Sequence, residues 1–106
     1  MNVTTVKLFL EVAEAGSLSK IAARRQTVQS HVSRQITDFE QQCGGRLFRR
    51  TGRGVELTDL GTRAAARLRA FLHETERLAE DLRSESSQIA GAVRLAEHLG
   101  PGHTIV

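Results

Sequence analysis

Two amphipathic segments of this chain are separated by only about three residues, and this short link restricts the folds that the chain can adopt. Within residues 18–25, Leu18, Ile21 and Ala22 fall on one face of a helix. Within residues 27–43, apolar side chains repeat at helical spacing along one stripe. That stripe consists of Val28, Val32, Ile36, Phe39 and Cys43. Helices joined by so short a link must cross at a steep angle, which predicts a helix-turn-helix.

Polar residues and glycines predict where these helices begin and end. A first helix precedes the pair, and Gly16 ends it, as Gly44 ends the third helix. The expected N-caps are Thr4 or Thr5 for the first helix, Ser17 or Ser19 for the second, and Thr27 for the third. Arg25 lies on the inner face of the second helix, so its charge must reach outward or bind phosphate.

The segment "RLFRRTGRGVELT" predicts a small β-hairpin after the third helix. Leu47-Phe48 and Val55–Leu57 are two short β-prone pieces, and the residues between them are rich in Gly and Arg. Gly52-Arg53-Gly54 is typical of a turn that requires positive φ. Such a hairpin would be the wing of a winged helix.

A long helix with a heptad pattern is predicted next. Thr58 can cap it, and Asp59 suits the positive end of its dipole. Gly91 is expected to end it, and Val93–Leu95 to begin a strand. The heptad positions are Ala64, Leu68, Phe71, Thr75, Leu78, Leu82, Glu85 and Ile89. An isolated helix would leave such a seam exposed, so the pattern indicates helix pairing.

The expected architecture is therefore mainly α. Residues 1–58 form a winged helix-turn-helix of three helices and a two-stranded wing, and residues 59–90 form a linker and dimerisation helix. Residues 91–106 form either the start of a further, effector-binding domain or a flexible tail. Sixteen residues cannot build a ligand pocket, so we expect a fragment of a longer protein in preference to a short form without a sensor.

The outer face of the third helix suits recognition of duplex DNA. Its first half contains no acid, and Gln can pair with adenine, Arg with guanine, and Ser with phosphate or base. The alternative is an amphipathic helix with an ordinary polar face. The segment Lys20–Arg53 holds eight basic residues against two acidic ones, which favours a polyanionic partner over a merely solvated basic face.

From residue 3 to about residue 95, the chain resembles the N-terminal part of LysR-type transcriptional regulators. The resemblance is carried by "FLEVAEAGSLSKIAAR", by "SRQITDFEQQCGGRLFRRTGRGVELTDLG" and by the long helix that follows. It implies a winged helix-turn-helix, a linker helix that pairs antiparallel between subunits, and a larger ligand-sensing domain beyond. The implied function is sequence-specific binding of double-stranded DNA in transcription regulation.

The resemblance also implies particular contact residues. Gln29, Ser33 and Arg34 match base- and backbone-contacting positions, and Arg50 and Arg53 match wing positions beside phosphates. Arg53 could enter a narrow minor groove, whose potential attracts arginine. The full set of candidate DNA-binding residues is Lys20, Gln29, Ser30, His31, Ser33, Arg34, Thr37, Arg50 and Arg53.

The chain departs from the family pattern around the turn. Arg25 replaces a core Leu, and Thr27-Val28 replaces Val-Ser. Thr27 could then cap the third helix one residue early, leaving Val28 as the first buried contact. The sequence does not decide at which residue this helix begins. Ser30 stands where the family usually has Pro, and His31 where it has a small residue.

The expected assembly is a homodimer on an imperfect palindrome with half-sites about one helical turn apart. Its dimerisation residues would be Leu68, Phe71, Leu78 and Leu82. A tetramer is compatible with a full-length form, and a small-molecule effector is expected only if a sensing domain follows. The rival interpretation is a helical interaction module, a sensor-less short regulator that acts through heterodimers.

Other chemistry is not indicated by the sequence. The histidines and the lone Cys43 lack zinc-ligand spacing, and no acid is placed to orient His31 for catalysis. We therefore expect no cofactor, no metal site and no enzymatic activity. Cys43 is expected to be a buried thiol in a cytoplasmic protein, since neither a signal peptide nor a membrane span is apparent.

Overall fold

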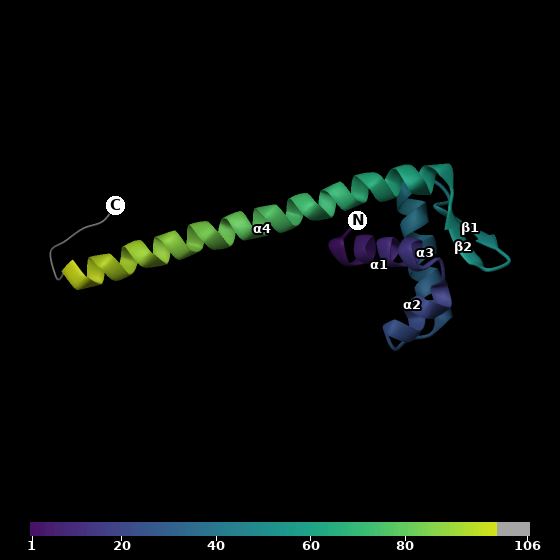
Figure 1. Cartoon of the computed structure of the whole chain (residues 1–106), viewed down its shortest axis with the longest axis horizontal. Helices are drawn as coiled ribbons and strands as arrows, with labels where there is room; N and C mark the ends of the chain where they lie inside the picture. The colour runs from purple at the N-terminus through teal and green to yellow at the C-terminus, as the bar shows by residue number, and fades with distance from the viewer. Residues whose placement is uncertain (100–106) are drawn as a thin grey trace. The chain divides into compact units, whose positions relative to one another are not determined.

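The computed structural model describes residues 1–99, with side chains described through residue 93. The predicted winged helix-turn-helix with a long following helix is confirmed (Figure 1). Its elements are α1 (Val3–Ala15), α2 (Leu18–Arg24), α3 (Gln29–Cys43), β1 (Phe48–Thr51), β2 (Gly54–Leu57) and α4 (Asp59–Leu99). The chain divides into two compact units, one of residues 1–72 and one that begins at His73.

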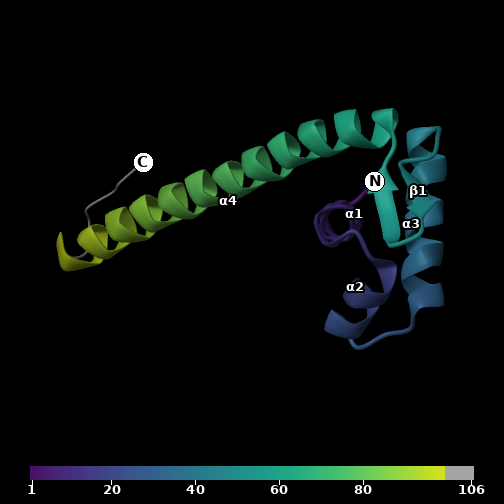
Figure 2. The same ribbon diagram turned by 45° about the vertical axis from the view of Figure 1, so that its right-hand side comes forward.

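The first unit is built around one apolar core. The ring of Phe9 from α1 lies 5.4 Å from that of Phe39 on α3 and 5.3 Å from that of Phe48 on β1, measured between centroids. Figure 2 shows α1 and α2 on the same side of α3. Ala65 and Leu68 of α4 belong to this core as well, so the unit extends beyond the boundary expected at residue 58.

The helix boundaries correct two of the predicted caps. Asn2, rather than Thr4 or Thr5, caps α1, since its Oδ1 accepts a hydrogen bond from the Thr5 N–H at 2.8 Å. Ser17 caps α2 as predicted, accepting from the Lys20 N–H at 3.1 Å. The prediction for Thr27 is wrong, because the N-cap of α3 is Val28. Gly16 and Gly44, both at positive φ, end α1 and α3 as predicted.

The two strands of the hairpin are longer, and the turn between them is shorter, than the sequence indicates. β1 and β2 pair antiparallel from Phe48 opposite Leu57 to Thr51 opposite Gly54, so Arg49 and Arg50 lie in a strand. Within the predicted turn, Gly54 has positive φ, at 149°. A Cβ there would lie 2.1 Å from the Gly16 carbonyl oxygen, which accepts the Val55 N–H at 3.0 Å.

α4 begins as predicted but continues further. Thr58 caps it by accepting the Gly61 N–H at 3.0 Å. The predictions that Gly91 ends this helix and that Val93 begins a strand are wrong, since the helix reaches Leu99. A glycine inside a helix lowers the stability of that helix by only about 1 kcal/mol relative to alanine, so the helical residues on both sides can carry the helix through Gly91. Residues 100–106 lie outside the described residues.

Among the described helices, none is both long enough and apolar enough to cross a membrane.

Candidate nucleic-acid interface

α3 separates a buried stripe from a polar surface. Val32, Ile36 and Phe39 are buried in the core. Most candidate contact residues on this helix are exposed, and Ser33 is half-buried. The exposed candidates are Gln29, Ser30, His31, Arg34 and Thr37. Gln29 and Arg34 thus expose an amide and a guanidinium to solvent, as the sequence predicts.

A cleft of about 520 Å³ lies between α3 and the hairpin. Ser33 and Thr37 of α3 line it together with Arg50 of β1, so three of the predicted residues meet at one place. Arg49 also lines the cleft, although it was not predicted as a contact residue. Its Nε donates to Glu56 Oε1 at 2.7 Å, so much of its charge is balanced within the hairpin.

The basic segment Lys20–Arg53 retains most of its positive charge. Three of its eight cations have acidic partners: Arg25 with Glu11, Arg46 with Glu40, and Arg49 with Glu56. The other five have no acidic partner within 4.0 Å in the part of the chain whose side chains are described. These five are Lys20, Arg24, Arg34, Arg50 and Arg53. They come from α2, α3 and the wing, and only Arg24 was missing from the predicted set.

Arg25 shows how a charge is accommodated where the family pattern has leucine. Its Nε donates to Glu11 Oε2 at 2.9 Å, and this ion pair joins the end of α2 to α1. Both side chains are partly exposed, so the pair contributes only modestly to stability. The sequence predicts that this charge reaches outward or binds phosphate, but it does not reveal Glu11 as the partner.

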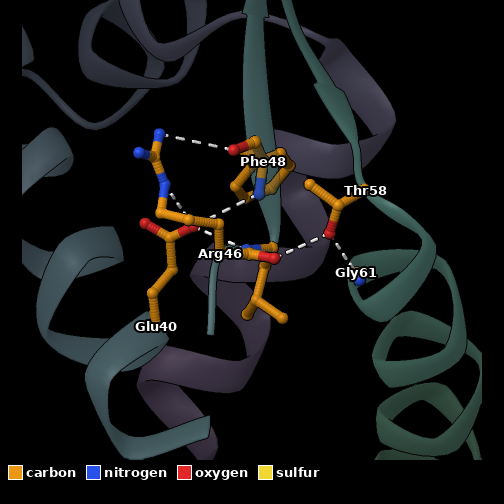
Figure 3. Close-up of polar contacts among 6 residues, drawn as sticks. Glu40, Arg46, Phe48, Thr58 and Gly61 are labelled. Atoms are coloured by element: carbon orange, nitrogen blue, oxygen red, sulfur yellow. Dashed lines mark hydrogen bonds and ion pairs between the residues drawn. The ribbon is translucent and has the colours of Figure 1, made fainter. Parts of the chain in front are cut away.

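A buried carboxylate connects the end of α3 to the wing (Figure 3). Glu40 is only 8% exposed, and its Oε2 accepts from the Leu47 N–H at 2.6 Å and the Phe48 N–H at 3.2 Å. Arg46 Nε lies 3.5 Å from the same oxygen. Thr58 Oγ1 donates to the Arg46 carbonyl at 2.7 Å, which brings the start of α4 into the network. These bonds set the position of the wing relative to α3.

The start of α3 is much less constrained. Val28, at φ −98° and ψ 152°, provides no side-chain cap, and it is 64% exposed instead of buried as predicted. Gln26 has φ 56°, a left-handed conformation that non-glycine residues rarely adopt. The Thr27 N–H donates to the Ala22 carbonyl at 2.9 Å and holds the turn. α2 and α3 are therefore linked by Arg25–Val28, one residue more than predicted.

Cys43 lies at the other end of α3 and packs against the core, although it is only partly buried. Burial, and then the nearby Glu40 carboxylate, raise the pKa of this thiol. The thiolate is therefore disfavoured, which is the opposite of what a reactive cysteine needs.

The predicted dimerisation residues do not all lie on one free surface. Leu68 is 9% exposed and packs in the core of the first unit, so little of its surface is free for a second copy. Phe71, Leu78 and Leu82 are exposed. Ile89 and Val93 on α4 are exposed too.

Three helices, a four-residue turn and a hairpin placed by Glu40 define a winged helix-turn-helix protein. A family model described as bacterial regulatory helix-turn-helix protein, lysR family, matches residues 3–62. The chain belongs to this family.

Individual relatives agree with this assignment. The chain is 38% identical over 96 residues to the HTH-type transcriptional regulator ClcR of Pseudomonas putida, with 91% of this chain and 33% of ClcR covered. It is 34% identical to an uncharacterized HTH-type regulator of Azotobacter vinelandii, covering 94% of this chain and 71% of that protein. The chain thus spans about a third of the length of relatives such as ClcR.

Solved structures show the same fold. A CbnR DBD–DNA complex has a TM-score of 0.75 and 31% identity, covering 81% of this chain and 99% of that one. A BenM DBD complex with catB site 1 DNA has a TM-score of 0.74 and 25% identity, covering 82% and 97%.

Proposed function

We propose that this chain binds double-stranded DNA sequence-specifically, as the DNA-reading part of a transcriptional regulator in the cytoplasm. The observation that carries the proposal is the group of five cations on α2, α3 and the wing that have no acidic partner in the described part of the chain. A polyanion would compensate them, and phosphates supply most of the affinity in DNA binding. The similar CbnR and BenM domains were solved with DNA.

Each contact residue has a role that follows from its chemistry and exposure. We assign Gln29 and Arg34 to bidentate contacts with base edges in the major groove. Ser33 and Thr37 line the cleft, where their hydroxyls suit phosphate. Arg53 at the hairpin tip is assigned to the minor groove. Phosphate or base contacts are assigned to the remaining candidates, which are Lys20, Ser30, His31 and Arg50.

Binding to duplexes selected from a random pool tests the function. Fluorescence anisotropy at about 50 mM salt should show saturable binding, which weakens steeply as salt increases because counterions are released. Binding no tighter than that of scrambled duplexes, or none at micromolar protein, would contradict the proposal.

Two arginine variants test the assigned roles. Arg34→Ala should lose about 1–3 kcal/mol and relax preference at one base pair. Arg53→Ala should weaken binding to all sequences and lower the salt slope by about 1. Arg83→Ala is the control, because Arg83 binds Glu80 on α4 at 2.7 Å and lies outside the candidate interface.

We further propose that α4 pairs with α4 of a second copy. Leu78 and Leu82 are more than half exposed within the second unit, and each side chain that becomes fully buried contributes about 1.5–3 kcal/mol. Leu78→Asp should therefore yield monomers in analytical ultracentrifugation. Ser87→Asp, which adds the same charge on the opposite helix face, should leave dimers intact; dimers in both variants would reject this seam.

A further inference from the structure

Val28 breaks two local rules at the start of α3. It is 64% exposed, and the other large apolar residues exposed within residues 1–58 are Met1, at 67%, and Val3, at 36%, both at the chain start. It also occupies an N-cap position without a hydrogen-bonding side chain. Ser, Thr, Asn or Asp there would stabilise the helix. Residues that break local rules in this way often serve a functional site.

The turn holds Val28 at the surface and next to the proposed contacts. Thr27, immediately before it, is half-buried, and its N–H is bonded to the Ala22 carbonyl. Gln29 and Ser30, immediately after it, are exposed at the first turn of α3. In a helix-turn-helix, the N-terminal residues of the second helix meet the base edges. The Val28 side chain is therefore continuous with the proposed DNA surface.

We propose that Val28 is a specificity residue that packs against the C5-methyl group of a thymine in the major groove. This inference rests on the proposed DNA-binding function. An isopropyl group has no hydrogen bond to offer a phosphate or a base heteroatom. The thymine methyl is the apolar group that base pairs present in the major groove, so it is the partner that this side chain can favour. Contact would remove both groups from water.

Removal of single methyl groups from the DNA tests this contact. Duplexes selected by the wild-type chain are remade with each thymine replaced in turn by uracil, which lacks only the C5-methyl. The wild type should bind about fourfold more weakly at one thymine position, the loss expected for one buried methyl group. Val28→Ser should bind the thymine and uracil duplexes equally at that position, while retaining the wild-type response at other thymines.

The controls separate this contact from effects on folding and from the proposed function itself. Val28→Ser should melt at a higher temperature than the wild type, since serine supplies the missing cap. Val3→Ser, at an exposed valine on α1, should keep the wild-type uracil response. A selected site without thymine, or a uracil response unchanged in Val28→Ser, overturns the role of Val28 while DNA binding stands. Absence of binding to any duplex overturns the proposed function, and this inference with it.

Discussion

The two ends of α3 differ sharply in the hydrogen bonds and the backbone conformations that hold them in place. At the C-terminal end, the Glu40 carboxylate accepts two backbone N–H groups and Thr58 fastens the start of α4. At the N-terminal end, Val28 offers no cap and Gln26 adopts a left-handed conformation. The same helix is thus firmly anchored at one end and left locally unfavourable at the other.

This difference separates scaffold from recognition surface. The anchored end fixes the hairpin beside α3, so a loss there should affect the whole fold. The other end holds the proposed base contacts. There, an exposed Val28 occupies a position where a capping residue would make the helix more stable. Substitutions at the two ends should therefore change stability by different amounts and in opposite directions.

Glu40→Ala should cause the largest loss. It would leave the buried N–H groups of Leu47 and Phe48 without an acceptor, at about 1–3 kcal/mol each, so we expect about 3 kcal/mol of destabilisation. Urea unfolding followed by circular dichroism would measure it. Asp38→Ala, at an exposed acid on the same helix, is the control and should change stability by less than about 0.5 kcal/mol. Equal effects would remove Glu40 from its anchoring role.

Gly61→Ala should destabilise the same end by about 2 kcal/mol. An added Cβ would lie 2.1 Å from the Leu47 carbonyl oxygen, so α4 and the strand start must move apart. Gly91→Ala is the matched change, because its Cβ meets nothing within 4 Å, and it should stabilise the helix by up to about 1 kcal/mol. Thermal melts that shift in the same direction for both variants would contradict this packing.

Gln26→Gly should stabilise the other end by about 1 kcal/mol. Glycine adopts the left-handed conformation without the Cβ penalty, although its freer unfolded state offsets part of the gain. Gln42→Gly, made at an exposed helical position on α3, should instead destabilise by about 1 kcal/mol. Opposite signs in urea unfolding would support the comparison, and a loss of stability in Gln26→Gly would defeat it.

The smallest effect is expected at Cys43. It should be seen in the alkylation rate of the thiol more than in the free energy of unfolding. Because burial raises its pKa, the thiol should react with iodoacetamide more slowly at pH 8 than in the denatured chain. Its raised pKa also means that stability falls as pH rises from the ordinary thiol pKa towards the folded value, since the unfolded state ionises first. Equal alkylation rates in the native and denatured chain would contradict the burial.

Most of the fold could be predicted from the sequence, because periodic apolar residues and glycines report local structure directly. The helix-turn-helix, the hairpin and the cap at Thr58 all follow from such patterns. The Glu40 network and the Glu11–Arg25 pair could not, since both join separate elements and depend on how those elements pack against one another. Val28 was misplaced because its apolar chemistry suggested burial, whereas the geometry of the turn exposes it.

For the candidate site, the sequence predicted which residues are exposed better than it predicted which of them lie together. Exposure of Gln29 and Arg34 followed from helical periodicity. The meeting of Ser33 and Thr37 with Arg50 depends on the path of the chain through the hairpin, which local patterns do not specify. Leu68 fitted the heptad pattern equally well as a core residue, so its spacing alone did not reveal that it packs within the first unit.

The contact between Gly16 and the hairpin allows the tip of the wing to change in sequence while the position of the strands is kept. The Val55 N–H binds a main-chain carbonyl, and Gly54, which must lack a side chain, passes close to the same group, so this joint does not involve the side chain of Arg53. Arg53 can therefore be exchanged for another residue without displacing the strands. A lineage, or a protein engineer, could retune what the tip contacts while the architecture stays unchanged.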